Sequence, residues 1–499
     1  MKKQLCTLLI FSSLMAACDN TDNNENEPIL SSEFKEISEI KIGGEAAAEI
    51  TAYDPVTQQL FVVNNSSGSS VDVIDFSDPS NMSIVSSIDI TTFGGGVNSV
   101  AVKNELLAIA VEADTKTDNG KVVLFKTNNL TSPEAILSVG ALPDMVTFSP
   151  DGKYILSANE GEPNDDYTID PKGSISIIDV ANSYAVKTLD FEPFNSKVAS
   201  LEEQGFRVFG PNATLAQDVE PEYITIDSQS QTAWVTLQEN NGIAKVDLIS
   251  QQITDIFPLG TKDFSQATNL MDASNKDDQV LLSNHPVMSF YQPDAIASFE
   301  INGVTYLVTA NEGDVRDYEG FSEEVRVKDI TLDPATFNNV SQLQLENNLG
   351  RLIVTNTKGD TNQDGIYETL YGFGARSFSI WNGSDGSLVS DCSTLEKDLM
   401  DTAPSHYDDG RSDDKGVEPE GVAIGAVNGK ILAFVGLERA DAVLVYDVSV
   451  PESPQFMQTL LTGDAPEGIL FIDADKSPTS KPLLLVSSED DGYLKVYSI

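Results

Sequence analysis

The chain has 499 residues, with 78 acidic against 30 basic side chains and a formal net charge of −48. A nucleic-acid-binding protein needs basic clusters that neutralise phosphates, and none occurs here, so we expect no nucleic-acid partner. The 34 Gly and 22 Pro stand between short β-branched runs, which favours an all-β fold.

Residues 1–18 have the pattern of a bacterial lipoprotein signal peptide. Two lysines precede an apolar stretch and small residues that end at Cys18. We expect Cys18 to carry the lipid and residues 19–32, rich in Asp, Asn and Glu, to form a disordered acidic tether. The protein is then a lipid-anchored protein of the cell envelope, periplasmic or on the surface, with no membrane contact except its anchor. The alternative is an ordinary signal peptide with an unrelated cysteine.

An internal repeat determines the expected architecture. Residues 156–162 and 307–314 are similar, because both are β-favouring runs that contain Asn-Glu-Gly. Related segments divide the chain into seven units of about four strands. Residues 33–43 alternate like a strand, and the last unit ends after its third strand. We therefore predict that residues 33–499 form a seven-bladed β-propeller closed by the N-terminal strand, with an open β-solenoid as the alternative.

Each unit carries an acid or Asn before its first strand and usually a Glu after its second. In a propeller both positions lie on one face. The predicted inner positions are Glu49, Asn98, Asp144, Glu222, Asp294, Glu420 and Glu467. The predicted outer positions are Glu112, Glu160, Glu239, Glu312, Glu438 and Glu489. All long insertions fall on the same face, at 161–173, 191–217, 261–292, 313–375 and 393–417. Long loops on one side of a rigid scaffold favour function there.

Carboxylates gathered around one axis repel one another unless positive charge joins them. Calcium is one candidate for that charge. The others are four arginines that could also bind an anion, Arg316, Arg376, Arg411 and Arg439. The alternative interpretation is that these acids only accept hydrogen bonds from turn amides.

A second acidic pattern lies inside the longest insertion. Oxygen donors alternate there with a glycine at the turn, as calcium loops require. The predicted ligands are Asp360, Asn362, Asp364, the carbonyl of Ile366, and Glu368. Tyr371 stands where a full EF-hand carries its bidentate Glu, so the alternative is an Asp-rich turn without metal.

Nucleophile-and-base hydrolysis is poorly supported, because the chain has only two His and no Gly-x-Ser-x-Gly motif. Zinc is disfavoured for the same scarcity of His and of mature Cys. If the protein is catalytic, we expect calcium-assisted attack of water on a phosphoester.

Several longer motifs, among them Ala-Asn-Glu-Gly-Glu-Pro-Asn-Asp-Asp-Tyr, resemble the choice-of-anchor I family of exported bacterial proteins. They lie at 94–103, 158–167, 220–223, 291–296, 323–328 and 411–416. Mesenchyme-specific cell-surface glycoproteins look related. The resemblance implies a secreted or surface β-propeller. Some relatives carry an alkaline-phosphatase label, and the fold is similar to phytase-like calcium propellers, which have six blades.

Two functions remain open at this point. The first is a calcium-binding propeller that binds a ligand or an envelope partner on its acidic face. The alternative is a calcium-dependent phosphoesterase, similar to alkaline phosphatase or phytase, that uses the same face.

Overall fold

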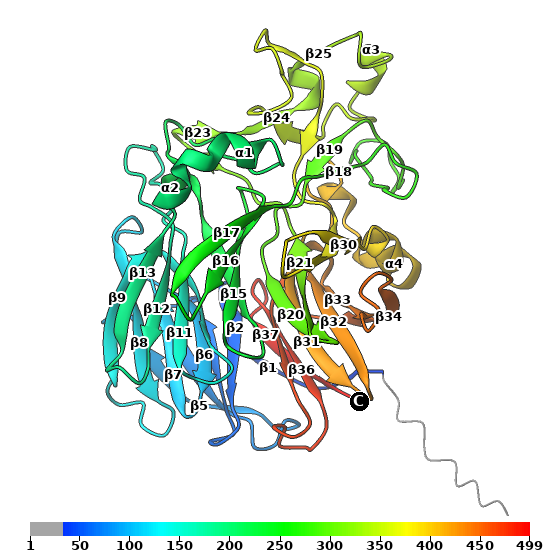
Figure 1. Ribbon diagram of the computed structural model, residues 1–499. Coiled ribbons are helices and arrows are strands. Elements are labelled where there is room, and N and C mark those ends of the chain that lie inside the picture. Colours follow the sequence, from blue (N-terminus) through cyan, green and yellow to red (C-terminus); the bar gives the residue numbers. More distant parts are fainter. Residues whose placement is uncertain (1–32) are drawn as a thin grey trace, which may run out of the picture.

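The computed structural model describes residues 33–499 (Figure 1), so the predicted signal peptide, Cys18 and the tether lie outside the described residues. Within that range the fold is all-β, with seven four-stranded antiparallel sheets and smaller sheets between them. Four-stranded sheets of this kind fit a β-propeller. None of the helices in residues 33–499 has the length and apolarity needed to cross a membrane.

The first four sheets follow the chain. They consist of β2 (Ala47–Asp54), β3 (Gln59–Asn64), β4 (Ser70–Asp75) and β5 (Ser83–Asp89); β6 (Val97–Lys103), β7 (Leu106–Val111), β8 (Asn119–Lys126) and β9 (Ala135–Ala141); β10 (Pro143–Phe148), β11 (Tyr154–Asn159), β12 (Ser174–Asp179) and β13 (Ala185–Asp190); and β14 (Pro221–Ile226), β15 (Thr232–Leu237), β16 (Gly242–Asp247) and β17 (Gln252–Pro258).

The other three sheets complete the series. They consist of β20 (Ile296–Ile301), β21 (Val304–Asn311), β29 (Ser377–Asn382) and β30 (Leu388–Asp391); β31 (Pro419–Val427), β32 (Lys430–Leu437), β33 (Ala442–Asp447) and β34 (Gln455–Leu461); and β35 (Pro466–Ile472), β36 (Leu483–Ser488), β37 (Tyr493–Ser498) and β1 (Lys35–Lys41).

Burial along the strands shows how the sheets pack. Every residue of β7 is buried, whereas β13 is exposed at all positions but Leu189. Strands buried on both faces are expected to be continuously apolar, and outer strands to be mostly polar. Hydrophobic clusters join each sheet to the next, and one cluster joins Leu60 of the first sheet to Leu485 of the seventh.

The first strand of the described chain pairs with the last. β1 lies antiparallel to β37, with Lys35 opposite Ser498 and Lys41 opposite Tyr493. Just before β1, Phe34 is 1% exposed, and its ring contacts that of Phe434 at a centroid distance of 5.3 Å. The N-terminal segment therefore covers an edge of the seventh sheet and fills a gap beside the sixth.

The insertions are folded, whereas the sequence suggested long loops. They carry η1 (Glu192–Lys197), α1 (Val198–Glu202), α2 (Leu215–Asp218), β18 (Thr261–Asp263), β19 (Met288–Phe290), β22 (Asp317–Tyr318), β23 (Phe321–Ser322), β24 (Glu324–Arg326), η2 (Val327–Asp329), β25 (Thr331–Leu332), α3 (Val340–Leu343), β26 (Ile353–Thr355), β27 (Ile366–Tyr367), β28 (Tyr371–Gly372), α4 (Leu395–Thr402), η3 (Pro404–His406) and η4 (Asp409–Arg411), while η5 (Glu438–Ala440) follows β32. Phe264, Leu332, Leu349 and Leu370 belong to a hydrophobic cluster of their own. A lobe with a separate core therefore stands at one end of the sheets (Figure 1).

We predict that Phe34→Ala lowers the free energy of unfolding by about 3 kcal/mol, because it leaves a cavity against Phe434. Urea denaturation followed by circular dichroism measures the change. Ile37→Ala is the matched control, because that side chain of β1 is 41% exposed. Equal stability of wild type and Phe34→Ala would show that the N-terminal strand does not support the sheets.

Candidate functional site: a carboxylate-lined cavity

The Asn-Glu-Gly motif is explained by its hydrogen bonds. Asn159 is fully buried at the end of β11, and its amide nitrogen donates to the hydroxyls of Ser174 and Ser176 on β12. Asn311 makes the same contacts with Ser377 and Ser379 on β29. The Asn side chain thus links the second strand to the third by hydrogen bonds. The Glu that follows it lies directly after the end of the second strand.

An irregularity in the first strand of a sheet determines how the side chain at its inner position is placed. In six of the seven four-stranded sheets of residues 33–499 the register shifts at that position, as between Pro143 and Met145 around Asp144. A β-bulge of this kind redirects one side chain. The residue before proline also has a positive φ in four units: Leu142 (47°), Gln292 (44°), Glu418 (48°) and Ala465 (56°). Left-handed backbone costs a non-glycine residue roughly 1–2 kcal/mol, so strain accompanies the inner positions.

A cavity of about 340 Å³ lies where these positions meet. Its acidic lining residues are Asp144, Glu160, Glu222, Asp294, Glu312, Asp314, Glu420, Glu438 and Glu467. All but Asp314 belong to the predicted acidic face. Asn98 also lines the cavity, whereas Glu49 lies beside it and accepts hydrogen bonds from Asn65. The predicted outer residues Glu112, Glu239 and Glu489 do not line it.

Burial and mutual repulsion raise the pKa values of these carboxyl groups. Desolvation is the larger cause for Glu49, whose pKa rises to about 8, and for Asp144, whose pKa rises to about 7. The pKa values of Glu222, Asp294 and Glu467 also lie well above the ordinary value, through desolvation and then the charges of their neighbours. Burial and the negative charge of neighbouring acids therefore favour protonated carboxyl groups in the cavity near neutral pH.

One corner of the cavity is already neutralised by the chain. Carboxylate oxygens of Glu312, Glu418 and Glu438 lie within 4.8 Å of one another. The ammonium of Lys415 lies 3.1 Å from Glu312 and 3.5 Å from Glu418, and Arg439 lies 2.8 Å from Glu438. Neither Lys415 nor Glu418 was predicted as a site residue, and the pairing of Lys415 with Glu312 has no local signal because the two lie 103 residues apart.

The four arginines proposed to bind anions are engaged with the protein. Arg316 is 1% exposed and pairs with Asp218 at 2.7 Å and Glu220 at 3.1 Å. Arg376 donates to the carbonyls of Asp272, Ser412 and Asp414. Arg411 pairs with Asp414 and Glu418, and Arg439 with Glu418 and Glu438. Three basic residues pair with Glu418 or Glu438, namely Arg411, Lys415 and Arg439. The side chain of Arg439 is the most exposed of them.

The predicted calcium loop brings three of its acids together. Carboxylate oxygens of Asp360, Asp364 and Glu368 lie within 4.8 Å of one another. The amide of Asn362 donates to Glu368 at 3.2 Å, and Gly365 has a φ of 83°, as the sharp turn requires. These residues stand in the insertion lobe and are not part of the central cavity.

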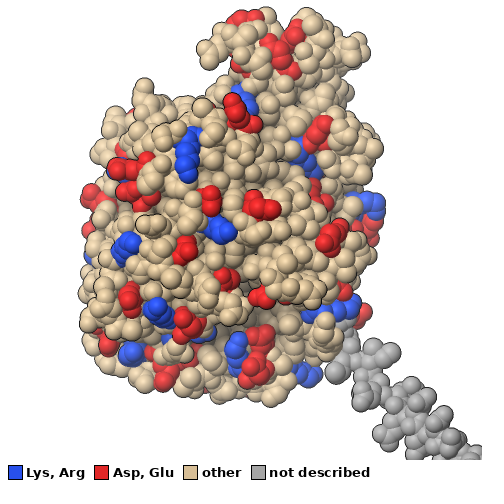
Figure 2. All heavy atoms as spheres, in the orientation of Figure 1, with Lys and Arg blue, Asp and Glu red and all other residues tan. Residues whose placement is uncertain are grey.

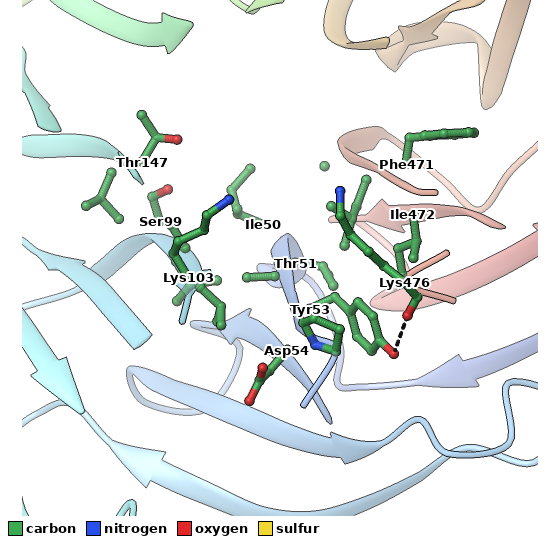
Figure 3. A pocket seen from close by; sticks show the side chains of 18 of the residues that line it. Ile50, Thr51, Tyr53, Asp54, Ser99, Lys103, Thr147, Phe471, Ile472 and Lys476 are labelled. Carbon is green, nitrogen blue, oxygen red and sulfur yellow. Dashed lines mark hydrogen bonds between the residues drawn. The ribbon is translucent and has the colours of Figure 1, made fainter. Parts of the chain in front are cut away.

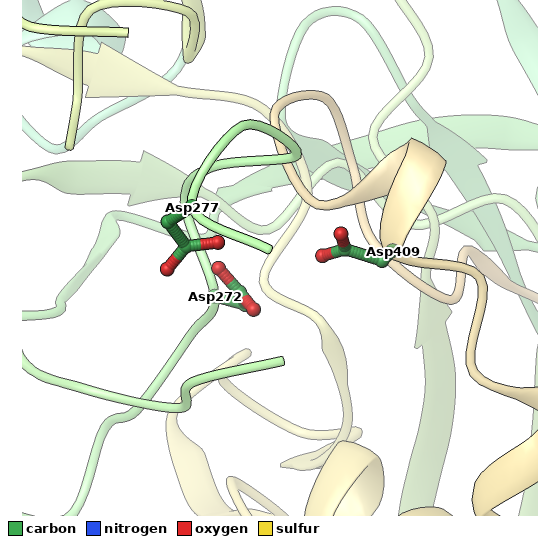
Figure 4. A group of neighbouring side chains, drawn as sticks. All are labelled: Asp272, Asp277 and Asp409. Atoms are coloured by element: carbon green, nitrogen blue, oxygen red, sulfur yellow. The ribbon is translucent and has the colours of Figure 1, made fainter. Parts of the chain in front are cut away.

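A third acidic group was not predicted. Asp272, Asp277 and Asp409 also have carboxylate oxygens within 4.8 Å of one another, and Figure 4 shows them facing across two insertions. The Oδ1 atom of Asp277 is buried without a hydrogen-bond partner. Burial raises the pKa of both Asp272 and Asp409. Acid clusters therefore occur in the insertion lobe as well as on the axis.

An apolar floor separates the acidic cavity from a second cavity of about 540 Å³ at the other end of the sheets. Five residues line both cavities and are mostly apolar: Ile50, Ser99, Met145, Tyr223 and Ile469. Figure 3 shows the second cavity, with Lys103 and Lys476 on opposite sides of it. On the face visible in Figure 2, acidic and basic side chains are interspersed. The concentration of negative charge is therefore a feature of the cavity and not of that face.

We predict that the protein loses thermal stability as the pH rises from about 5 to about 8, because a carboxyl whose folded pKa is raised stabilises the fold only while it is protonated. Melting followed by circular dichroism measures this in low salt without divalent ions. Glu222→Gln/Glu467→Gln should show a shallower fall, because it removes two of the groups. Equal slopes for both proteins would contradict the assignment of the raised pKa values to the cavity.

Two solved structures align with most of this chain. Hydrazine synthase of Kuenenia stuttgartiensis aligns with 92% of this chain and 97% of its own, with 12% identity and a TM-score of 0.50. The β-propeller domain of Cps50 (Swd1) from Myceliophteria thermophila aligns with 94% of this chain, with 8% identity and a TM-score of 0.47. Because the sequence identity is so low, the alignment with hydrazine synthase shows similarity of fold alone.

Two animal proteins are similar in sequence. The mesenchyme-specific cell surface glycoprotein of Strongylocentrotus purpuratus is 27% identical over 331 residues, which are 56% of this chain and 42% of the glycoprotein. Gigasin-3a of Magallana gigas is 26% identical over 193 residues, which are 32% of this chain and 68% of gigasin-3a. The match thus spans less than half the length of the glycoprotein.

The family model described as the choice-of-anchor I domain matches residues 49–451. These residues include six of the seven inner positions, the acids of the outer set except Glu489, and every insertion. The chain belongs to the choice-of-anchor I family.

Proposed function

We propose that this protein is an exported, lipid-anchored β-propeller that binds a cationic ligand in its carboxylate-lined cavity and calcium in its insertion lobe. The seven four-stranded sheets are its blades, and the pairing of β1 with β37 closes the ring. The family supports an exported or cell-surface location. Lipidation at Cys18 supplies attachment to the cell envelope.

The observation that carries the proposal is the absence of counter-charge around five of the acids that line the cavity. Within residues 33–499, no lysine, arginine or histidine lies within 4.0 Å of the carboxylates of Asp144, Glu222, Asp294, Glu420 or Glu467. Buried carboxylates without a partner are costly, and structures keep them where a ligand or reaction uses them. A cation gains from all of them at once, so binding of positive charge is the function this geometry supports best.

The calcium assignment rests on the donor set of the insertion loop. Asp360, Asp364 and Glu368 supply three carboxylates within reach of one ion, and Asn362 with the Ile366 carbonyl adds neutral oxygens. The loop lies between β26 and β28 of the insertion lobe and includes β27, so a bound ion would stiffen that lobe.

The phosphoesterase alternative receives less support. Arg316 and Arg376 are buried and already bonded, so their guanidinium groups do not face the cavity. Hydrolysis of p-nitrophenyl phosphate, with and without calcium, tests it, and we expect no turnover above the blank. Calcium-dependent turnover that Arg439→Gln abolishes would replace binding by catalysis as the function.

We predict that Asp364→Ala weakens calcium binding at least about tenfold and leaves the propeller folded, because the loop lies outside the sheets. Calcium titration in a calorimeter and metal analysis of the purified protein measure the affinity, and the circular dichroism spectrum reports the fold. Glu452→Gln, at an exposed position outside every acidic group, is the control. Calcium binding of equal strength in wild type and Asp364→Ala would remove the metal from this loop.

A further inference from the structure

The acidic cavity contains buried oxygens that lack any partner. The Oε2 atoms of Glu222, Glu420 and Glu467 are inaccessible to solvent and accept no hydrogen bond. The whole side chain of Glu222 is only 9% exposed. The three residues come from β14, β31 and β35, so the unsatisfied oxygens are distributed around the cavity. Native structures rarely leave such groups without a partner, and rotation of each carboxyl group toward the cavity would let a bound hydrogen-bond donor supply one.

The spacing of these carboxylates argues against one chelated metal ion. Calcium binds oxygens at 2.3–2.6 Å, so its ligands lie within about 5 Å of one another. In residues 33–499, only three groups of acids meet a 4.8 Å limit, and none of them contains Asp144, Glu222, Asp294, Glu420 or Glu467. The positive charge that suits this cavity is therefore spread over a larger ligand.

The protein itself shows which cation these carboxylates accept. In the neutralised corner, the primary ammonium of Lys415 lies 3.0 Å from Asp314 and 3.1 Å from Glu312. An ammonium has up to three donors and so pairs with several carboxylates at once, as Lys415 does with Glu312, Asp314 and Glu418. The rest of the cavity presents the same carboxylate chemistry without the lysine.

The residues at the floor of the cavity also favour a ligand with an apolar part. Ile50, Met145, Ile469 and the ring of Tyr223 provide most of the surface shared with the second cavity, and Ser99 is the one small polar residue among them. Acidic walls over an apolar floor match a chain in which ammonium groups alternate with methylene groups. A volume of about 340 Å³ accommodates such a molecule and not only an ion.

We propose that the central cavity binds a small aliphatic polyamine, with ammonium groups on the carboxylates of Glu222, Glu420 and Glu467 and methylene groups on the apolar floor. This inference rests on the proposed cation-binding function and names its ligand class. Because the cavity acids must ionise to hold the ligand, binding strengthens as the pH rises from about 6 to about 8 and releases protons. It weakens as salt is added, because part of the attraction is screened.

The experiment is calorimetric titration of the purified protein with spermidine at low salt and about pH 8. We expect one micromolar site in the wild type and binding weakened at least about tenfold in Glu222→Gln/Glu467→Gln. Glu420→Gln alone provides a second, milder variant. Glu452→Gln, on the exposed surface, should bind spermidine as the wild type does. Circular dichroism and melting verify that each variant is folded.

Three outcomes would overturn the inference. If spermidine does not bind but calcium binds in a manner that Glu222→Gln/Glu467→Gln abolishes, the cavity is a metal site, and the proposed function stands without the polyamine. If spermidine binds equally to both cavity variants and the wild type, the amine site lies elsewhere. If neither spermidine nor calcium binds at the cavity at any pH between about 6 and 8, the cation-binding function falls as well.

Discussion

Negative charge without compensation is the constraint on which this structure depends. At least five carboxylates meet at one cavity, and the described chain supplies them with no basic partner. Burial and mutual repulsion oppose their ionisation, so the cavity either holds protons or holds a cation. The β-bulges and left-handed residues that place these acids add strain at the same positions. Only a scaffold that is well packed elsewhere tolerates such a site.

The packing of the sheets provides that scaffold. Their second and third strands are buried and apolar, and each sheet shares a hydrophobic cluster with the next. The insertions are held differently, by buried ion pairs such as Arg207 with Glu323 and Arg316 with Asp218. Removing one partner of such a pair would leave a buried charge unpaired, which is strongly destabilising. These pairs join the segment before β14 to the insertion at 313–375, and Lys415 of another insertion pairs with Glu312 of the cavity.

Much of this arrangement could be predicted from the sequence because it repeats. The Asn-Glu-Gly segments and the acid before each first strand recur, so eight acids now found in one cavity were named in advance. The pairing of the N-terminal strand with β37 followed from counting strands. The acids of the predicted calcium loop also lie together, since they are close in sequence.

What was missed depends on contacts between distant segments. The insertions were expected to be loops, but Phe264 and Leu332 meet in a core that no local pattern reveals. The partners of Arg316 lie 98 and 96 residues away, so its ion pairs could not be inferred from its neighbours. The group of Asp272 and Asp409 joins two insertions and has no motif.

The central claim is that the cavity acids lack counter-charge until a cation binds. Potentiometric titration of the purified protein, with and without spermidine, measures this most directly. The account predicts that carboxyl groups of the cavity titrate near neutral pH, as the pKa of about 7 for Asp144 indicates, and that their titration shifts to lower pH when the amine is added. Carboxyl groups that all titrate in the ordinary acidic range of the free protein would contradict it.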